Sequence, residues 1–545
     1  MSNRTELPIT ASGRLAVGVI LVVWAAVNVF SADQTPVIDS EPRLSDLGQY
    51  IESSLLEWDF PGLAVAVVLD DKVVFARGFG IKELGKDDPV DAKTLFQIGS
   101  TTKAFAAATL GALVDDGLLE WDDPVVTHLP WFALKDPAVT RNVTIRDLLA
   151  HRSGMPAHAF PALTLLNAKE VAERARMLDN QTPLREEFRY SNQAYGIAGL
   201  IVEEVTGRDW GDWLKERILS PLHMSDSEGS PYNIWGDSYV APAFLGTAPR
   251  GQVGIADAPE MNVAMPHGVD RDEVRRVLPW QSYDNLQAAG SMVSNVMDMA
   301  NWLIMQVNAG VFEGVQVLNA TTVQEMHAPQ ISSQSTFLFT DEGRPVSYGM
   351  GWTRETFNGK TYLSHGGGIF GFPAYAALLP EIKAGIVVLA NGSTWTPYYP
   401  HQEITARVFS RLLDLEDKDW KSRAVTQTQA ILEQVDQIFA AQDAARAENT
   451  ETTLPLSEYL GTYTSDVSGP FTIFMDGDRM RLQFEGVGAF SGELEHWHHD
   501  EFRLFFDGGD GQAYGSSLVT FTVDTQETVQ QLELGAFGVY RPATQ

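Results

Sequence analysis

The apolar and polar positions first become regular after about residue 44. Apolar residues at helical spacing in 44–58 predict a helix, which Pro61-Gly62 interrupts. The apolar, β-branched run 63–69, the turn Asp70-Asp71 and a second run at 72–76 then predict a β-hairpin. The folded part of the chain is therefore expected to begin with a helix and two antiparallel strands.

Helical and strand patterns alternate through the middle of the chain. The stretch 231–280, rich in Pro, Gly and Asp, predicts a long loop-bearing insertion, and long loops often carry function. Helices are expected from Ser100 to 114, at 144–149 with Thr144 as N-cap, at 192–206 and at 294–307. Strands are expected in the 350s, 360s and 370s and at 384–390.

The composition changes near the end of the chain. The polar stretch 419–446 predicts a helix and 447–453 a linker. Beyond the linker, alternating segments between Asp-Gly turns predict a small all-β unit, a meander or barrel, with strands near 471–475, 480–484, 501–506, 518–523 and 529–534. We expect an N-terminal segment (1–33), an α/β domain (34–415), a helical connector (416–452) and a β-barrel-like domain (453–545).

The N-terminus has the pattern of an export signal. Arg4 and Arg14 precede an uncharged, mostly apolar run, 15–32, which Asp33 ends. A basic region before an apolar one is typical of signal peptides, and this run is near the shortest length that spans a membrane. We interpret it as a signal peptide or an uncleaved anchor, with the rest of the chain exported, periplasmic or extracellular, and tethered to the membrane if the segment is an anchor.

Charge and cysteine content narrow the possible partners and chemistry. The 545 residues are too many for one ordinary core, and the formal net charge of −32 makes nucleic acid an unsuitable partner. The chain has no cysteine, which excludes disulfides, thiolate catalysis and Cys-ligated zinc. The sequence leaves the oligomeric state open.

The strongest local motif is Gly99-Ser100-Thr101-Thr102-Lys103, at the start of a predicted helix. Residues three apart share a helix face, so Ser100 and Lys103 are expected to point into one cleft. The first turn of a helix offers unpaired N–H groups, and a desolvated lysine can lose its proton and act as a base. Taken alone, the motif is more simply explained by a capping serine and a solvent-facing lysine.

Two further motifs follow along the chain. In Tyr190-Ser191-Asn192, before a helix, the tyrosine can relay protons and the amide can bind the lysine and a substrate amide. In His365-Gly366-Gly367-Gly368, the glycines indicate close approach of another backbone or a ligand, and an N–H there can complete an oxyanion hole. Each alone also fits ordinary loop packing. Their order, Ser-x-x-Lys, Tyr-x-Asn and His-Gly-Gly, matches serine β-lactamases and penicillin-binding proteins.

With these motifs, residues 44–415 resemble the class C β-lactamase and penicillin-binding-protein-like family, which includes D-alanyl-D-alanine carboxypeptidases, D-aminopeptidases and carboxylesterases. The resemblance implies an α/β fold, a mainly antiparallel sheet flanked by helices, with a helical subdomain that holds Tyr190. The terminal β unit resembles the lipocalin-like domain of some exported members. Supporting segments are 61–67, 144–156, 290–294 and 348–352, and in the β unit 459–463 and 539–542.

The resemblance also implies roles for the motif residues. Ser100 is the nucleophile, Lys103 and Tyr190 share the general base and acid roles, and water cleaves the acyl-enzyme. The backbone N–H groups of Ser100 and Gly368 stabilise the oxyanion. No metal or cofactor is implied. The residues that bind the substrate or the oxyanion are Asn192, His365, Gly366, Gly367 and Gly368.

One departure from the family pattern affects the substrate. His365 stands where class C β-lactamases carry the lysine of Lys-Thr-Gly, which binds the β-lactam carboxylate. A histidine there resembles the esterase and D-peptidase branches of the family. The expected extracellular placement then favours a D-amino-acid peptidase or carboxypeptidase-like enzyme acting on a peptide or small molecule. A broad carboxylesterase, a weak β-lactamase and a catalytically silent ligand-binding or sensor protein are the alternatives.

Some other residues carry weaker hypotheses. His496 and His498 lie on one face of a strand and suggest a metal site, although a polar strand edge explains them more simply. His151 and Arg152 are interpreted as the structural end of a helix. Aromatic and histidine candidates for the cleft or its rim are His267, Trp280, Trp395, Tyr398 and Tyr399.

Overall fold

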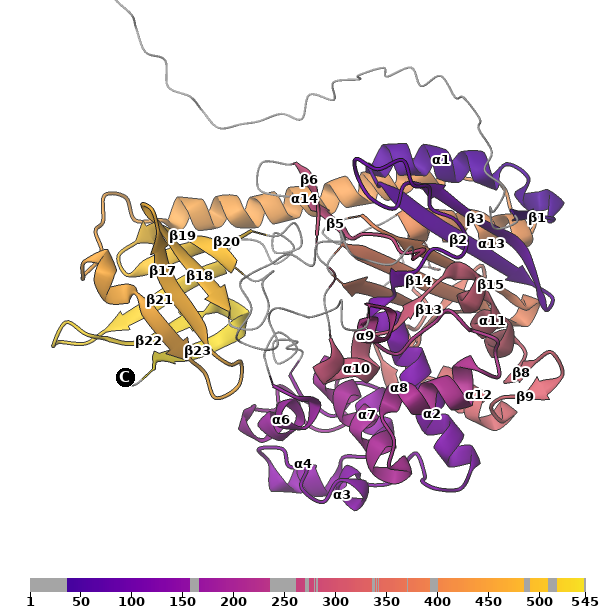
Figure 1. Cartoon of the computed structure of the whole chain (residues 1–545), viewed down its shortest axis with the longest axis horizontal. Helices are drawn as coiled ribbons and strands as arrows, with labels where there is room; N and C mark the ends of the chain where they lie inside the picture. The colour runs from indigo at the N-terminus through magenta and orange to yellow at the C-terminus, as the bar shows by residue number, and fades with distance from the viewer. Residues whose placement is uncertain are drawn as a thin grey trace, which may run out of the picture. The chain divides into compact units, whose positions relative to one another are not determined.

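A computed structural model describes most of the chain beyond its N-terminal segment (Figure 1). The predicted signal or anchor segment lies outside the described residues, and in the part described no helix is long and apolar enough to cross a membrane. The described residues are 37–156, 166–235, 261–269, 274–278, 280, 283–335, 339, 341, 343–369, 371–392, 400–484, 491–507 and 517–543.

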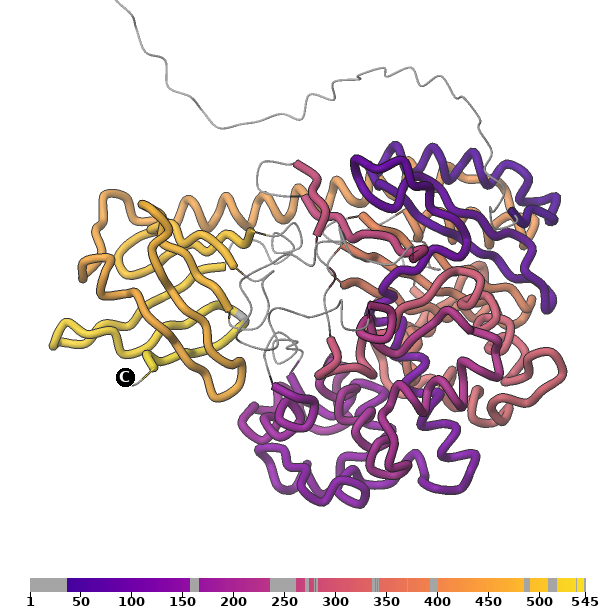
Figure 2. Tube along the Cα trace, in the orientation of Figure 1, coloured from indigo at the N-terminus to yellow at the C-terminus, as the bar shows by residue number. Residues whose placement is uncertain are grey.

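A nine-stranded antiparallel sheet forms the centre of the α/β unit, which confirms the expected fold class. The predicted first hairpin pairs with the last apolar strand of the unit, so Leu63 lies opposite Ala390. Figure 2 shows these indigo and orange segments side by side. Across the sheet, the strands are β1 (Ile38–Asp39), β3 (Lys72–Gly80), β2 (Gly62–Leu69), β15 (Ala384–Ala390), β14 (Phe372–Leu379), β13 (Lys360–Ile369), β12 (Thr353–Phe357), β11 (Ser347–Tyr348) and β10 (Ile331–Ser332).

Helices and three short strand pairs surround this sheet in the described residues. The pairs are β4 (Phe96–Gln97) with β7 (Val293–Ser294), β5 (His267–Val269) with β6 (Arg275–Val277), and β8 (Val311–Phe312) with β9 (Val315–Gln316). The helices are α1 (Leu47–Trp58), α2 (Thr102–Asp115), α3 (Val125–His128), α4 (Pro137–Asn142), α5 (Ile145–Leu149), α6 (Ala168–Glu173), α7 (Asn192–Thr206), α8 (Trp210–Leu214), α9 (Pro231–Trp235), α10 (Gln287–Gly290), α11 (Val296–Val307), α12 (Ala320–His327), α13 (Pro400–Leu412) and α14 (Trp420–Ala445).

Both faces of the sheet are buried, which explains why its central strands are apolar throughout. Leu63 and Val65 of β2 join a hydrophobic cluster with α1 and α13, whereas Ala64 and Ala66 join another with α2 and α11. Successive side chains of a strand point to opposite faces, so one cluster lies on each face. α2, in the second cluster, carries Lys103 of the candidate site.

The predicted helices are confirmed, with some shifts at their ends. α7 has the predicted bounds because Ser191 caps its start and Gly207, at φ +67°, ends it in the left-handed conformation. Thr144 caps α5 in a capping box, as expected. The helix expected from Ser100 instead begins at Thr102, because the residues before it form a 3-10 turn.

The stretch 231–280 is less irregular than expected. Its described residues include α9 and the β5–β6 hairpin. The hairpin is short, and its strands lack the long alternating pattern on which strand prediction depends. The described residues of this loop-bearing insertion therefore include a helix and a hairpin that its composition did not predict.

The C-terminal β unit is a closed eight-stranded barrel, which confirms the predicted all-β unit. β16 and β23, additional to the expected strands, close it by pairing Tyr463 with Pro542. The buried rings of Tyr459, Phe471 and Phe521 occupy the small core that eight strands enclose. The lipocalin likeness and the domain limits stay predictions. The strands are β16 (Gly461–Thr464), β17 (Phe471–Asp476), β18 (Arg479–Phe484), β19 (Ser491–His498), β20 (Glu501–Phe506), β21 (Ser517–Val523), β22 (Val529–Leu534) and β23 (Gly538–Pro542).

Candidate active site

The segment that carries Ser100 follows strand β4, which pairs with β7. The glycines of β13 lie against this segment. A Cβ on Gly367 would lie 2.1 Å from the carbonyl oxygen of Ile98. Gly99 has φ +49°, and a Cβ there would lie 2.7 Å from the backbone nitrogen of Gly368. Only glycine fits such contacts, so the predicted close approach of the glycine strand is to the nucleophile segment itself.

Lys103 lies one helical turn after Ser100 and is fully buried. Its Nζ lies 3.1 Å from Ser100 Oγ, 2.7 Å from Asn192 Oδ1 and 2.8 Å from the Ala289 carbonyl oxygen. Burial holds the pKa of the Lys103 amine well below its ordinary 10.5. In the neutral amine, the two hydrogens are taken by the Asn192 and Ala289 oxygens, and the lone pair faces the Ser100 hydroxyl. This arrangement suits a base for Ser100.

Tyr190 approaches Ser100 from the loop before α7. The Ser100 side chain lies close enough to the Tyr190 hydroxyl to affect its pKa, and the ring centroid of Tyr190 lies 4.7 Å from Lys103 Nζ. Burial raises the pKa of the Tyr190 hydroxyl above its ordinary 10, against a smaller lowering by Ser100. The phenol therefore holds its proton at neutral pH beside the Ser100 oxygen. The structure thus brings together Ser100, Lys103, Tyr190 and Asn192 from two chain segments that are far apart in the sequence.

His365 borders the site on β13, where both of its ring nitrogens are engaged. Nδ1 donates to the Gly366 carbonyl oxygen at 2.7 Å, which leaves Nε2 to accept from the Tyr348 hydroxyl at 2.9 Å. Burial, with Lys103 nearby, lowers the pKa of His365 to about 3. Its ring is therefore neutral at neutral pH and presents no charge to a substrate.

No local sequence pattern places His151 or Tyr348 at the site. α5 ends at Leu149, and the buried ring of His151 packs against Tyr190 with ring centroids 4.3 Å apart. The interpretation of His151 as a mere helix end is therefore incomplete. Both residues lie in segments that carry the family resemblance, 144–156 and 348–352, and this is the one signal that pointed to them.

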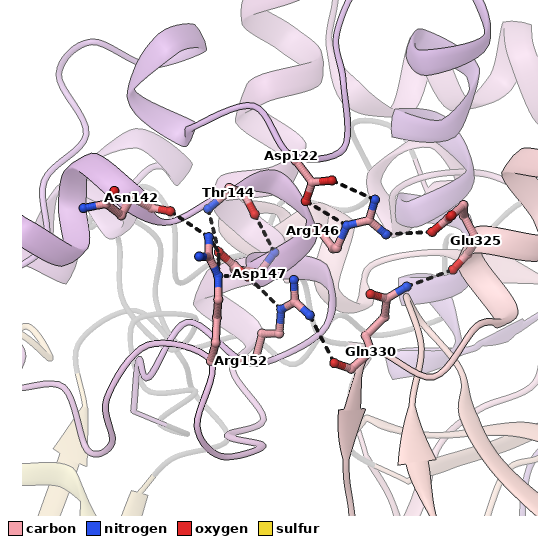
Figure 3. Close-up of polar contacts among 9 residues, drawn as sticks. Asp122, Asn142, Thr144, Arg146, Asp147, Arg152, Glu325 and Gln330 are labelled. Atoms are coloured by element: carbon pink, nitrogen blue, oxygen red, sulfur yellow. Dashed lines mark hydrogen bonds and ion pairs between the residues drawn. The ribbon is translucent and has the colours of Figure 1, made fainter.

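A buried carboxylate anchors the chain around His151 (Figure 3). Asp147 accepts from Arg152 Nε at 2.7 Å, from Arg185 Nη2 at 2.8 Å and from the Thr144 backbone N–H at 3.0 Å. Burial alone would raise the pKa of Asp147, but the hydrogen bonds from Arg185, Thr144 and Arg152 lower it below 3.8. Arg152 also donates to the Gln330 carbonyl oxygen, so the network joins α5 to two later segments.

Asp147→Asn is expected to lower the free energy of unfolding by about 3 kcal/mol, because it leaves two arginines without their buried partner. The folded-state pKa of Asp147 lies below the unfolded value, so its stabilisation is present above about pH 3.8 and is lost as pH falls through the folded pKa. Urea denaturation at pH 7 measures the loss. Asp122→Asn, which breaks the exposed pair with Arg146, is the control and should cost less than about 1 kcal/mol. Equal losses would contradict the role of Asp147.

The weaker candidates lie apart from this cluster or outside the described residues. A register shift separates His496 from His498, His498 Nε2 lies 3.1 Å from Glu501 Oε2, and no described group of three or more His, Asp or Glu could hold a metal. His267 Nδ1 donates to the Asn391 carbonyl oxygen, and Trp280 Nε1 donates to Ala264. Trp395, Tyr398 and Tyr399 lie outside the described residues.

Comparison with known families shows which family the chain belongs to. The chain belongs to the beta-lactamase family, whose model matches residues 49–408, and it is a serine hydrolase. Residues 445–541 match the model of a domain of unknown function, DUF3471.

Among individual proteins, an unguisins hydrolase from Aspergillus violaceofuscus is 29% identical over 497 residues, 86% of this chain and 84% of the relative. Two solved structures, each 23% identical, share the fold. The octameric penicillin-binding protein homologue from Pyrococcus abyssi has a TM-score of 0.57 and covers 91% of this chain and 100% of its own. The D-amino acid amidase from Ochrobactrum anthropi SV3, complexed with L-phenylalanine amide, has a TM-score of 0.54 and covers 68% and 99%.

Proposed function

We propose that this serine hydrolase cleaves amide bonds of D-amino-acid peptides or amides through an acyl-enzyme on Ser100. The observation that carries the proposal is the contact between the buried Lys103 amine and the Ser100 hydroxyl at 3.1 Å. Binding or sensing alone does not need a buried amine, whose desolvation is costly, against a serine. The silent alternative is therefore disfavoured.

The reaction follows from this geometry. Ser100 Oγ attacks the substrate carbonyl while its proton passes to Lys103 Nζ. The backbone N–H groups of Ser100 and Gly368 stabilise the oxyanion. The amide nitrogen leaves with a proton delivered through Tyr190, which is restored by the proton that Lys103 took. Water then attacks the ester, with Lys103 and Tyr190 exchanging the same protons in reverse.

Two observations support the class of substrate. The D-amino acid amidase shares the fold over two thirds of this chain, and the unguisins hydrolase is similar over most of it. His365 is neutral with both nitrogens engaged, so it cannot pair with a substrate carboxylate as a lysine would. We therefore favour substrates without a free carboxylate at the scissile end over carboxypeptidase or β-lactam substrates.

We expect a D-amino-acid dipeptide amide to be cleaved with a kcat/KM at least about 10-fold above that of the same dipeptide as the free acid. The reason is the cost of placing an unpaired carboxylate beside a neutral imidazole in a desolvated site. His365→Lys supplies a cation there and should lower the ratio of kcat/KM for the amide to kcat/KM for the free acid. A ratio of one or below in the wild type would exclude this substrate preference.

A hydrolysis panel tests the proposed activity. It contains a D-phenylalanine amide, a D-alanine anilide, a D-Ala-D-Ala peptide, a short-chain nitrophenyl ester and nitrocefin, each also run with Ser100→Ala. Turnover of a D-amino-acid amide or anilide that depends on Ser100 supports the proposal. Turnover of the ester alone would replace it with a carboxylesterase, and turnover of nitrocefin alone with a β-lactamase.

We further propose that residues 15–32 direct the protein out of the cytoplasm, as a cleaved signal or an anchor. The support is the basic and then apolar pattern of the N-terminus. Fractionation of cells that express the whole chain, and a chain that starts at Asp33, tests the proposal. Export of the whole chain alone supports it, and equal cytoplasmic retention of both contradicts it.

A further inference from the structure

The backbone of His151 has an unusual conformation directly after α5. Its φ is +56°, a region in which non-glycine residues other than Asn, Asp and His are rare. Its side chain is fully buried although it is polar. Such conformations cost energy and persist where the surrounding contacts hold them, often beside functional sites. The contacts of His151 identify what this residue does.

His151 binds the chain on both sides of Tyr190. Its carbonyl oxygen accepts from the Arg189 N–H at 2.7 Å, and its ring Nδ1 accepts from the Ser191 N–H at 3.0 Å. The Tyr190 ring packs on the imidazole between these two bonds, with centroids 4.3 Å apart and a 38° angle between planes. One residue therefore fixes the peptide groups before and after the tyrosine and also the face of its ring.

The bond from Ser191 also determines the form of the imidazole. Nδ1 accepts a hydrogen from Ser191, so it carries none, and the neutral ring has its hydrogen on Nε2. A proton on Nδ1 would remove the bond to Ser191. Burial, with Lys103 and His365 nearby, holds the pKa of His151 well below 6.5, which preserves the accepting form.

We propose that His151 is a positioning residue that acts through Tyr190, by holding the tyrosine hydroxyl on the Ser100 oxygen. This inference rests on the proposed role of Tyr190 in proton transfer. The bond to Ser191 also fixes the start of α7, whose first residue, Asn192, accepts from Lys103. A shift of the 189–191 segment by about 1 Å would misplace the phenol, and such misplacement costs about 10²-fold in rate.

Two substitutions separate the hydrogen bond from the ring packing. In His151→Asn, Oδ1 occupies the place of Nδ1 along the side chain and can accept from Ser191, and Asn tolerates a positive φ. In His151→Phe, the ring remains and the acceptor is lost. Phe188→Leu is the control, because Phe188 contacts the His151 ring, with centroids 5.6 Å apart, and makes no side-chain hydrogen bond to it.

The test measures kcat and KM of each variant on the best substrate of the panel, with melting curves to confirm folding. We expect His151→Phe to lower kcat about 10²-fold with KM within about 3-fold. His151→Asn should stay within about 5-fold of the wild-type kcat, and Phe188→Leu within about 3-fold. A folded His151→Phe with near-wild-type kcat, or one faster than His151→Asn, would overturn the proposal.

A double substitution shows whether the effect passes through Tyr190. In a Tyr190→Phe background, His151→Phe should lower kcat less than about 3-fold further, because the group it positions is already gone. If kcat of the double variant fell by the product of the two single-variant factors, a positioning role would be contradicted. Failure of the proposed function would appear differently, as wild-type turnover that Ser100→Ala leaves unchanged.

Discussion

Replacing Ser100 with alanine is expected to lower kcat/KM by about 10⁶-fold, the largest effect of any single substitution in this enzyme. We expect the alanine variant to keep the fold. Ser100 lies in a short 3-10 turn, and its hydroxyl lies next to Lys103 and Tyr190, the groups of the proposed proton transfer. It removes the atom that forms the acyl-enzyme, so Lys103 and Tyr190 have no proton to exchange. KM should change little.

Steady-state kinetics on the best amide substrate measure this loss. Thr101→Ala, at the next position, is the control, because Thr101 Oγ1 donates to the Ile98 carbonyl and is not among the hydrogen-bond partners of Lys103 Nζ. It should stay within about 10-fold of the wild type. A Ser100→Ala enzyme that kept more than about 1% of wild-type turnover would require another nucleophile.

Replacing Lys103 with methionine is expected to lower the rate of acylation by about 10³-fold or more. Methionine has a similar length and packs readily in an apolar interior, so the substitution should preserve the packing of α2. The change removes the lone pair that faces Ser100 and the donor to Asn192 Oδ1 and to the Ala289 carbonyl. The loss should therefore fall on kcat and on kcat/KM together.

The pH profile identifies the form of Lys103 that acts. A base must be unprotonated, so activity rises as pH increases through the pKa of Lys103. Burial lowers that pKa far below 10.5, so the wild type should already be active at neutral pH. The acid limb of kcat/KM should vanish in Lys103→Met. Activity that appeared only above pH 10, or an acid limb that survived the substitution, would contradict a neutral Lys103 as the base.

Local sequence patterns predicted the groups that lie close together along the chain. Ser100 and Lys103 share a helix face by spacing alone, and Ser191 and Gly207 mark the two ends of α7 with their own conformational preferences. Glycine at 366–368 indicated a close backbone approach, and the structure shows that Ile98 and Gly99 make it. Each of these predictions depends on residues within a few positions of one another, whereas the segment that the glycines contact lies far away in the chain.

The contacts that sequence did not predict join residues far apart in the chain. His151 meets Ser191 forty positions later, and Tyr348 of β11 meets His365 of β13 across the intervening strand β12. Nothing in either local pattern specifies the partner, because the pairing depends on how α5, α7 and β13 pack. The short β5–β6 hairpin was missed for a related reason: tertiary contacts, rather than an alternating pattern, stabilise it.

The central claim is that substrate is cleaved through an ester on Ser100, and mass measurement of the peptides obtained after rapid acid quenching tests it most directly. The enzyme is mixed with a D-phenylalanyl anilide, quenched within one turnover and digested. We expect the peptide that contains Ser100 to gain the mass of one D-phenylalanyl group in the wild type, and no gain in Ser100→Ala. Turnover of the anilide with no adduct, or with an adduct on another residue, would contradict the account.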